Sequence, residues 1–462
     1  MKRILLVIAI FCSSNAVFAQ SELTLPFMEH VFQSSYLNPT VRPEHTISIG
    51  LPAMSSVYMQ VIHNGFVPNS VLAKEGNTLV LNPQDLPGAM KNSNMIYANA
   101  GIEFFHLRFK VYHWDYWFAV RQNHEMSFFY PKDLFKLAAF GNYEFAGQTM
   151  DFSPLGFNMS LYREYTFGMA TEVNEWAYGG RISLLQGLGN TYLKPKTLSI
   201  AVDDDMYALT ADANGVLYTS GIPLDSANMP DISRYTEGFD MANYKENQLY
   251  QFLTRFRNPG VALSGGVSYK YDSRTKFTLS FSDLGFISWS DSTKNYLLKG
   301  NHTFSGVDGL ADFLYGRGVN TDSIIDAALD NFSDDDFSDS YLTWLSPKIY
   351  LRADYQLARR TQLGLQLYSV INRKFYPAFT VGIQQGFGRV FSVLLTGSFN
   401  QRSFTNLGFG MVIKPGPFQI YLVADNYYSP VVDPLSFTNF NFRTGVNLVF
   451  GRPKKPQGLP YR

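Results

Sequence analysis

Residues 438–450, TNFNFRTGVNLVF, alternate between apolar and polar side chains along their whole length. Successive side chains of a β-strand point to opposite faces, so this pattern predicts a strand with one apolar and one polar side. The apolar side carries Phe440, Phe442, Val446, Leu448 and Phe450, and the polar side carries Asn441, Arg443, Gly445 and Asn447. Such a strand suits either a soluble sandwich or a membrane barrel.

The same alternation fills the rest of the C-terminal half. Residues 261–271 and 277–282 predict a hairpin joined by the turn Asp272-Ser273-Arg274-Thr275. Further strands are predicted at 348–357, 361–367, 376–385, 389–399, 404–413 and 418–427, with turns at 358–360, 386–388 and 414–417. Two of these turns, 386–388 and 414–417, are rich in the glycine and proline that turns require.

The N-terminal half is less regular. Residues 102–111 and 116–129 predict a hairpin in which Glu103 shares a face with Phe105, opposite Phe104 and His106. Further strands are expected at 156–171, 178–187, 196–202 and 206–220. Residues 20–45 show no clean period and are interpreted as a plug or hatch inside the lumen. The whole chain then predicts about 14 to 16 strands, and a barrel of about 14.

The first residues predict a cleaved export signal. Met1-Lys2-Arg3 precedes an apolar stretch from Ile4 to Phe11, and Val17-Phe18-Ala19 places small residues where cleavage before Gln20 requires them. The alternative, an N-terminal membrane anchor, would need a longer apolar core. Cys12, the only cysteine, lies within this segment, so residues 1–19 as a signal leave a mature chain without thiols or disulfides.

The bulk composition favours a membrane barrel over a soluble β-protein. Removing Lys2 and Arg3 lowers the basic count from 38 to 36 against 38 acidic residues, which gives a formal charge of about −2 and no indication of nucleic-acid binding. The mean hydropathy is −0.10, yet 16% of the 462 residues are aromatic. Barrel strands alternate lipid-facing and lumen-facing side chains and carry aromatic girdles, which produces this combination.

Loop lengths predict the orientation of the barrel. With the last strand descending to the periplasm, the short turns all fall on the periplasmic side, and the long insertions near 221–258 and 290–344 fall outside the cell. Residues 240–256 have near-helical apolar spacing and predict an amphipathic helix in an external loop, and 322–330 predict a second short helix. The barrel then covers residues 46–451, and residues 452–462 form a periplasmic tail.

Polar residues that alternate inward are the candidate ligand-binding groups of this chain. They are Lys348, Arg352, Asp354, Gln356, Asn441, Arg443 and Asn447. Charges of both signs inside a barrel hold a plug, line a pore or pair across the lumen, and the sequence leaves these three interpretations open.

No catalytic, cofactor or metal signature stands out. The chain has no G-x-S-x-G elbow and no phosphate-binding glycine loop, and His124-Glu125 is followed four residues after His124 by Phe128 instead of a second histidine. The runs 203–205 and 334–336 are aspartate triplets without the spacing of a calcium loop, and are interpreted as solvated turns. We therefore expect no enzymatic activity, no cofactor and no metal, although a triad assembled from different strands would escape this search.

Several local strings together resemble an uncharacterised outer-membrane β-barrel family of Bacteroidota, described as a domain of unknown function. They are Leu37-Asn38-Pro39, Asn258-Pro259-Gly260, Ser282-Asp283-Leu284-Gly285-Phe286-Ile287-Ser288-Trp289, Phe304-Ser305-Gly306-Val307-Asp308-Gly309, Asp425-Asn426 and Asn447-Leu448-Val449-Phe450-Gly451. The family is distantly similar to the FadL long-chain fatty-acid channels and to PorV, a shuttle protein of type IX secretion. The resemblance implies an outer-membrane barrel of about 14 strands with an N-terminal hatch.

Two functions follow from the resemblance as expectations. The first is passive transport of a hydrophobic or amphipathic small molecule across the outer membrane. The second is a non-enzymatic scaffold or accessory subunit with a protein partner from the outer membrane or a secretion complex, for which the long insertions supply surface. Both place the protein among outer-membrane lipids and neither involves nucleic acid.

Overall fold

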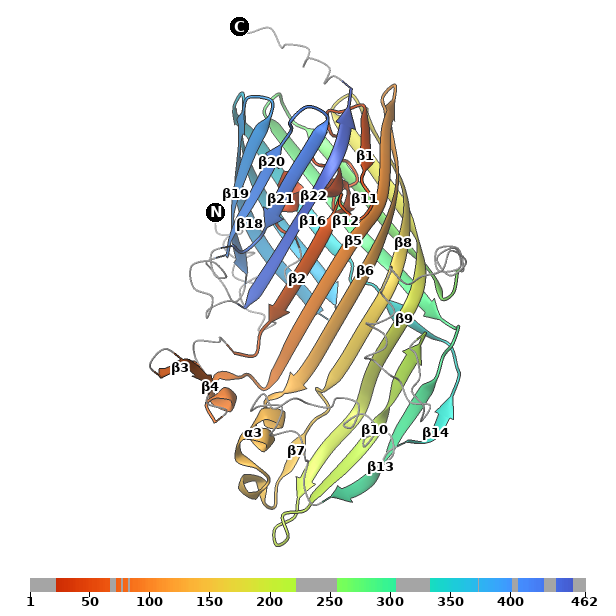
Figure 1. The fold of residues 1–462 in the computed structure, drawn as a ribbon, viewed down its shortest axis with the longest axis vertical. Coiled ribbons are helices and arrows are strands. Elements are labelled where there is room, and N and C mark those ends of the chain that lie inside the picture. Colours follow the sequence, from red (N-terminus) through yellow and green to blue (C-terminus); the bar gives the residue numbers. More distant parts are fainter. Residues whose placement is uncertain are drawn as a thin grey trace.

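The computed structural model describes residues 22–66, 72–75, 78–81, 84–221, 256–304, 333–372, 374–400, 406–427 and 438–451. Within these residues the chain forms a closed antiparallel barrel of fourteen strands, which confirms the predicted fold class (Figure 1). The first wall strand consists of β1 (Ile47–Gly50) and β2 (Val57–His63). The others are β5 (Ser93–Val111), β6 (Trp114–Pro131), β8 (Gly156–Val173), β9 (Trp176–Val202), β11 (Pro259–Lys270), β12 (Thr275–Trp289), β16 (Lys348–Ala358), β17 (Thr361–Asn372), β18 (Lys374–Phe387), β19 (Phe391–Asn400), β20 (Asn406–Ile413), β21 (Phe418–Ala424) and β22 (Asn439–Phe450).

The last strand closes the barrel against the first. In β22, Phe450 lies opposite Ile47 of β1, and Thr444 lies opposite Val57 of β2. Closure leaves no unpaired edge in the wall, which a lipid-embedded sheet requires because lipid offers no hydrogen bonds to backbone groups.

Side chains alternate between an apolar outer wall and a polar lumen. On β17, Leu365 and Leu367 are 49% and 44% exposed, whereas Gln366 between them is 1% exposed. A group of exposed aromatic residues lies near one end of the barrel, as expected at a membrane interface, and others, such as Phe167 and Phe281, lie farther along the wall. The group consists of Tyr112, Trp176, Tyr178, Tyr271, Phe387, Phe418 and Phe450.

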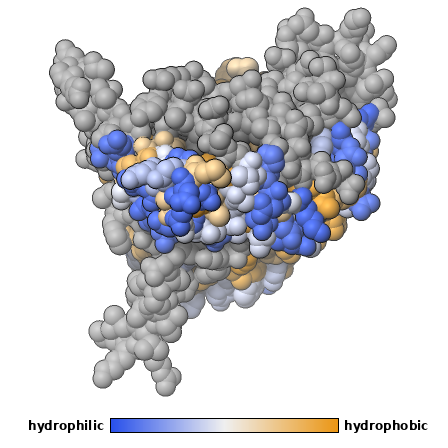
Figure 2. All heavy atoms as spheres, turned by 90° about the horizontal axis from the view of Figure 1, so that it is seen from below, coloured by the Kyte–Doolittle hydropathy of each residue, from blue (hydrophilic) through white to orange (hydrophobic). Residues whose placement is uncertain are grey.

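The two ends of the barrel differ in their connections. At the short-turn end, drawn at the top of Figure 1, strands are joined by residues 112–113, 174–175, 271–274, 359–360, 388–390 and 414–417. The opposite, long-loop end carries an arm in which β9 continues beyond the wall and pairs with β10 (Leu209–Ser220), followed by β13 (Asn295–Phe304) and β14 (Ser333–Phe337). Viewed from this end, the described residues are largely hydrophilic, and hydrophobic residues appear on the flank (Figure 2).

The arm leaves the wall at a tightly packed junction. β9 pairs with β11 as far as Gln186 and with β10 from Asn190 onward. Trp289, which is fully buried, packs against Gly187, between the part of β9 that pairs with β11 and the part that pairs with β10. Asn258 Oδ1 accepts hydrogen bonds from the backbone N–H groups of Ser290 and Asp291 at 2.8 Å each. These contacts fix the angle between arm and wall.

Smaller elements cover the long-loop end. They are β3 (Leu72–Glu75), β4 (Thr78–Leu81), α2 (Leu86–Ala89), α3 (Lys132–Phe140), η4 (Tyr143–Phe145), β7 (Thr149–Asp151) and β15 (Tyr341–Trp344). In the described ranges, no helix is long and apolar enough to cross a membrane. The helix predicted at 240–256 lies outside the described residues except for Phe256, which is not helical. The helix predicted at 322–330, the predicted signal at 1–19 and the predicted tail at 452–462 lie wholly outside them.

Two details of the predicted strands were wrong. The predicted strands at 178–187 and 196–202 are one continuous strand, β9. Pro195 does not end this strand, because it lies next to a shift in the β9–β10 register that accommodates it. Glu103 was placed on the same face as Phe105, opposite His106. A register shift between Glu103 and Phe105 instead turns both Glu103 and His106 into the interior, where they are 1% and 0% exposed. A β-bulge has this effect because it adds one residue to the two-residue period.

Candidate functional site

Residues 22–45, hereafter the plug, lie inside the barrel next to the short-turn end (Figure 1). The plug contains two short 3₁₀ helices, η1 (Leu25–Phe27) and η2 (Phe32–Tyr36). Its apolar side chains, including Leu23, Leu25 and Val31, are completely buried against lumen-facing residues such as Tyr421. Each such side chain contributes about 1.5–3 kcal/mol when removed from water, so the plug is a packed part of the fold.

The beginning of the plug is held by Asp425 at the end of β21. Its carboxylate accepts hydrogen bonds from the backbone N–H groups of Leu23 and Thr24, both at 2.8 Å. Asn441 of β22 donates to the same carboxylate from Nδ2 at 2.6 Å. The predicted inward residue Asn441 therefore orients the carboxylate that anchors the plug.

A second anchor is ionic. Glu29 of the plug pairs with Lys276 of β12 and, at 2.8 Å, with Nη2 of Arg352 on β16. Arg352 also donates to the Pro26 carbonyl and pairs with Asp354 at 2.8 Å. Burial raises the pKa of Glu29, but Lys276 and Arg352 outweigh it and hold that pKa at about 2.

The centre of the plug is received by Glu103 of β5. Its carboxylate accepts hydrogen bonds from the Tyr36 hydroxyl and, at 3.3 Å, from Gln33 Nε2. Gln33 Oε1 also accepts from Asn447 Nδ2 at 2.9 Å. Glu103 is thus a buried acceptor for two plug side chains at once.

Glu103 also forms a chain with His106 and Ser48. His106 contacts the carboxylate through Nδ1 and the Ser48 hydroxyl through Nε2, at 2.9 Å. This is the connectivity of a serine-hydrolase triad. All three side chains are at most 2% exposed, and Phe32 of the plug stacks on the His106 ring at 4.1 Å. We therefore interpret the hydrogen-bonded series Glu103–His106–Ser48 as part of the surface on which the plug packs.

The wall is shaped to let the plug approach closely. A Cβ atom at Gly179 of β9 would overlap the Pro39 carbonyl, and one at Gly364 of β17 would overlap the Phe27 ring. Beside Pro39, Asn38 Oδ1 accepts hydrogen bonds from the backbone N–H and the hydroxyl of Thr40, at 3.1 and 2.8 Å. The Thr40 hydroxyl in turn contacts the hydroxyl of Ser268 on β11 at 2.7 Å.

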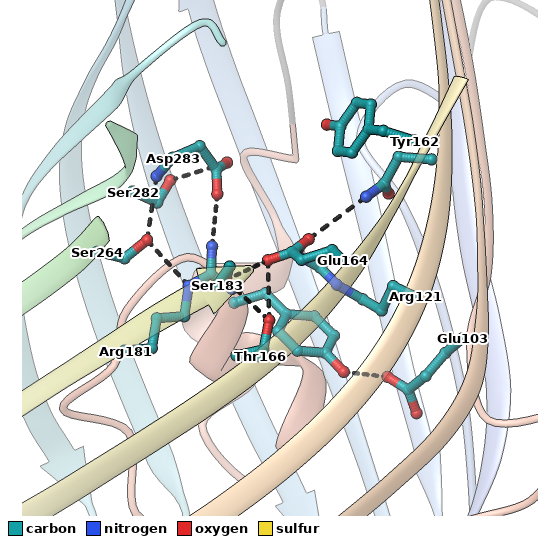
Figure 3. A network of polar contacts seen from close by, with 12 residues as sticks. Glu103, Arg121, Tyr162, Glu164, Thr166, Arg181, Ser183, Ser264, Ser282 and Asp283 are labelled. Carbon is teal, nitrogen blue, oxygen red and sulfur yellow. Dashed lines mark hydrogen bonds and ion pairs between the residues drawn. The ribbon is translucent and has the colours of Figure 1, made fainter. Parts of the chain in front are cut away.

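A polar cavity of about 50 Å³ lies between the plug and the wall. It is lined by side chains of both, and its charged residues are Glu22, Arg121, Glu125, Glu164, Asp283, Lys348 and Arg443. Several of them form a network shown in Figure 3, in which Arg121 pairs with Glu164, and Arg181 pairs with Asp283. Lys348 Nζ lies 2.7 Å from the other oxygen of Asp283. A cavity of this size and polarity holds a few water molecules or a small polar group.

Asp283 enters the lumen through a bulge in β12. Leu263 lies opposite Leu284 and Gly265 lies opposite Phe281, so Ser282 and Asp283 together face the single residue Ser264. Asp283 has φ of 62°, an uncommon conformation for a residue other than glycine. Bulges re-aim side chains near functional sites, and this one turns a carboxylate toward Arg181 and Lys348.

All seven candidate residues predicted from the sequence lie on the lumen side of the wall. Three of them contact the plug directly: Arg352 pairs with Glu29, Arg443 pairs with Glu22, and Asn447 donates to Gln33. Asp354 and Asn441 support those contacts, and Lys348 lines the cavity. Gln356 instead donates to the carbonyls of Ala358 and Thr361 at its own turn.

Sequence reasoning missed the acidic residues that matter most here. Glu103 and Asp283 lie at register shifts, where strict alternation gives the wrong face or none. Glu125 and Glu164 lie on long strands that alternate less cleanly. One signal was available for Asp283, because Phe281 and Leu284 are both apolar and outward but three residues apart, which indicates an inserted residue.

The class of protein is defined by these features: a closed barrel with an apolar, aromatic-girdled outer wall and a plugged polar lumen is an outer-membrane β-barrel protein. The family model described as "Family of unknown function (DUF5723)" matches residues 39–425, and the chain belongs to that family.

The solved structures to which the chain is similar include hydrocarbon channels and a FadL homologue. A TodX deltaS2S3 mutant, a monoaromatic hydrocarbon channel, aligns with a TM-score of 0.44 at 9% identity, covering 89% of this chain and 93% of that chain. The P. putida toluene transporter TodX gives 0.42 at 7% identity, with 91% and 94% covered. A Pseudomonas aeruginosa FadL homologue gives 0.39 at 9% identity, with 89% and 92% covered. No curated protein matches the sequence.

Proposed function

We propose that this protein is a gated passive channel for small amphipathic molecules, and that residues 22–45 are its gate. The observation that carries the proposal is how the plug is held. Besides its apolar packing, the plug is held by hydrogen bonds and ion pairs at Asp425, Glu29 and Glu103. Water replaces such contacts at small net cost, because a typical hydrogen bond contributes only about 0.5–1.5 kcal/mol net.

The position of the cavity supports the same proposal. Its lining combines plug residues such as Tyr36 with wall residues such as Arg121 and Lys348. Displacing the plug would therefore enlarge an existing polar space, and it would also separate the apolar contacts that Leu23, Leu25 and Val31 make with the wall. Wall side chains alone fill a barrel of about eight strands, so a barrel of fourteen strands has a lumen wide enough for a separate segment and a cavity.

A reversible cross-link tests the gate. We would replace Thr40 and Ser268, whose hydroxyl oxygens are 2.7 Å apart, with cysteine and record conductance in planar lipid bilayers before and after oxidation. A second pair, Thr24→Cys with Thr396→Cys, fixes the other end of the plug, where the hydroxyl oxygens are 2.8 Å apart. Oxidation should suppress channel openings in both variants, and reduction should restore them.

The control is a third pair outside the lumen. Thr210 and Thr303 on the arm have hydroxyl oxygens 2.9 Å apart, so cysteines there form a bond of matched geometry far from the plug. Openings in this variant should not respond to oxidation. Unchanged openings in the two oxidised plug variants, with the disulfides confirmed by mass spectrometry, would show that the plug is a fixed part of the wall and would end the proposal.

A further inference from the structure

We propose that the wall of the cavity binds the primary ammonium group of an amphipathic ligand, at a patch formed by Asn99, Asn123, Glu125 and Tyr162. This inference rests on the proposed channel function and specifies the polar head of the molecule that the channel accepts.

The patch is contiguous on the inner wall. Glu125 of β6 lies directly opposite Asn99 of β5, and Asn123 of β6 lies directly opposite Tyr162 of β8. Glu125 and Asn123 are two residues apart on one strand and share its inner face. Residues paired across strands have Cβ atoms about 5 Å apart, so the four polar groups converge on one small area. All four line the cavity.

Charge distinguishes Glu125 from the other acidic residues of the cavity. Glu22 pairs with Arg443, Glu164 pairs with Arg121, and Asp283 pairs with both Lys348 and Arg181. In the part of the chain that the structure describes, no cation lies within ion-pair distance of Glu125, and its contact is the Tyr162 hydroxyl at 3.1 Å. Glu125 is thus the one carboxylate of the four in the lining for which the described residues provide no ion pair.

The amides beside Glu125 offer acceptors. Asn99 Nδ2 donates to the Tyr97 hydroxyl at 3.2 Å, and Asn123 Nδ2 donates to Glu164 at 3.4 Å. Each of these amides also has a carbonyl oxygen that can accept a hydrogen bond from a ligand. A carboxylate with two carbonyl oxygens matches the three N–H donors of a primary ammonium group.

A buried hydroxyl independently indicates a missing partner. Tyr58 of β2 also lines the cavity and is 6% exposed, yet its hydroxyl has no hydrogen-bond partner among the described residues. A buried hydroxyl without a partner costs free energy, so such groups normally contact solvent or a ligand that the polypeptide itself does not supply. The space of about 50 Å³ is sufficient for an ammonium group and the first carbons of an alkyl chain.

Binding of n-butylamine tests the inference, because it is small, water-soluble and cationic at neutral pH. We would titrate the full-length protein in detergent with n-butylamine, butyrate and butanol, following each by ligand-observed NMR. Butylamine should bind the wild type, and Glu125→Gln should weaken it by about tenfold, as expected for loss of a charge-assisted hydrogen bond. Tyr58→Phe should weaken it by a smaller factor.

The control variant is Asp212→Asn, which removes a carboxylate from the exposed surface of the arm and should leave binding unchanged. Equal butylamine binding to wild type and Glu125→Gln, tighter binding of butyrate than of butylamine, or displacement of butylamine by an equal concentration of potassium would each overturn the inference. The gate is tested separately, because conductance of the cross-linked plug does not depend on Glu125. Suppressed openings with unaltered butylamine binding in Glu125→Gln would preserve the channel and reject the ammonium site.

Discussion

The Tyr36 hydroxyl donates a hydrogen bond to the Glu103 carboxylate, and so joins the middle of the plug to the wall strand β5. The same phenol ring carries the Arg121 guanidinium on its face, 3.8 Å from the ring centre. One plug side chain thus bridges the buried acceptor at Glu103 and the charged network of the cavity. Any movement of the plug must separate both contacts together.

Tyr36→Phe isolates the hydrogen bond, because the ring and its contact with Arg121 remain. We expect a loss of about 1.5–3 kcal/mol in the free energy that holds the plug, the range for a hydrogen bond to a charged group. We expect this loss of free energy to appear as more frequent channel openings in planar bilayers. Combined with Glu103→Gln, the two effects should be less than additive, since both remove the same contact. Fully additive effects would show that the two residues act separately.

Gly179→Ala tests the close approach of the plug to β9. A methyl group there would overlap the Pro39 carbonyl, and overpacking of this kind costs about 1–3 kcal/mol. We expect residues around Asn38-Pro39 to become accessible to added protease while the barrel stays folded. Gly397→Ala is the matched control, because nothing lies within 4 Å of a Cβ at that wall glycine. Equal protection of Asn38-Pro39 from protease in both variants would contradict the close packing of Pro39 against Gly179.

Acidification should loosen the ionic anchor at Glu29. The pKa of Glu29 is lowered from 4.5 to about 2, where Lys276 and Arg352 outweigh the burial that raises it. Its stabilising contribution is therefore fully present above pH 4.5 and is lost as the pH falls toward 2. Channel openings should increase across that window in the wild type.

The matched variant Glu29→Gln should show more openings already at neutral pH and a smaller increase between pH 4.5 and 2. Other carboxylates contribute equally to both proteins, so the difference between the two pH profiles reports Glu29. Superimposable profiles would place the acid-sensitive contact elsewhere.

Trp289→Ala should destabilise the junction between wall and arm. The side chain is completely buried, and removal of a buried tryptophan typically costs about 3–5 kcal/mol. Thermal unfolding in detergent should shift downward, while plug protection from protease, about Asn38-Pro39, should not change. Trp344→Ala, at a tryptophan that is 70% exposed, serves as the comparison. A larger effect at Trp344 would refute the packing assigned to Trp289.

The fold could be predicted where the two-residue period is strict. The alternation is regular in β22 and in the paired part of β16 and β17 from Leu351 to Gln356, and it places the predicted residues in the lumen as expected. These residues are Arg352, Asp354, Asn441, Arg443 and Asn447. Glu103 and Asp283 could not be placed by alternation, because register shifts beside them are set by pairing with neighbouring strands and not by the local sequence. The partners of the lumen-facing charged residues could not be predicted either, because the plug residues that they contact are distant in the sequence.

Several strings that carried the family resemblance lie at these contacts. Asn38-Pro39 lies against Gly179, and Asp425 holds the first described plug residues. Asn258 and Trp289 form the junction of the arm, and Asp283 is the bulged carboxylate of the cavity. The strings that carry the resemblance therefore include residues that form close packing contacts, hydrogen-bond anchors and a β-bulge, although the resemblance did not indicate what they contact.

The anchor at Asp425 orders the events of folding. Leu23 and Asp425 are 402 residues apart in the chain, and Arg443, which pairs with Glu22, lies on the strand that closes the barrel. Contacts so distant in sequence form late, because the intervening chain must first be organised. The receptor for the start of the plug thus exists only after β21 and β22 have joined the wall. Seating of the plug marks completion of assembly, and an incomplete barrel lacks the groups that would seal it.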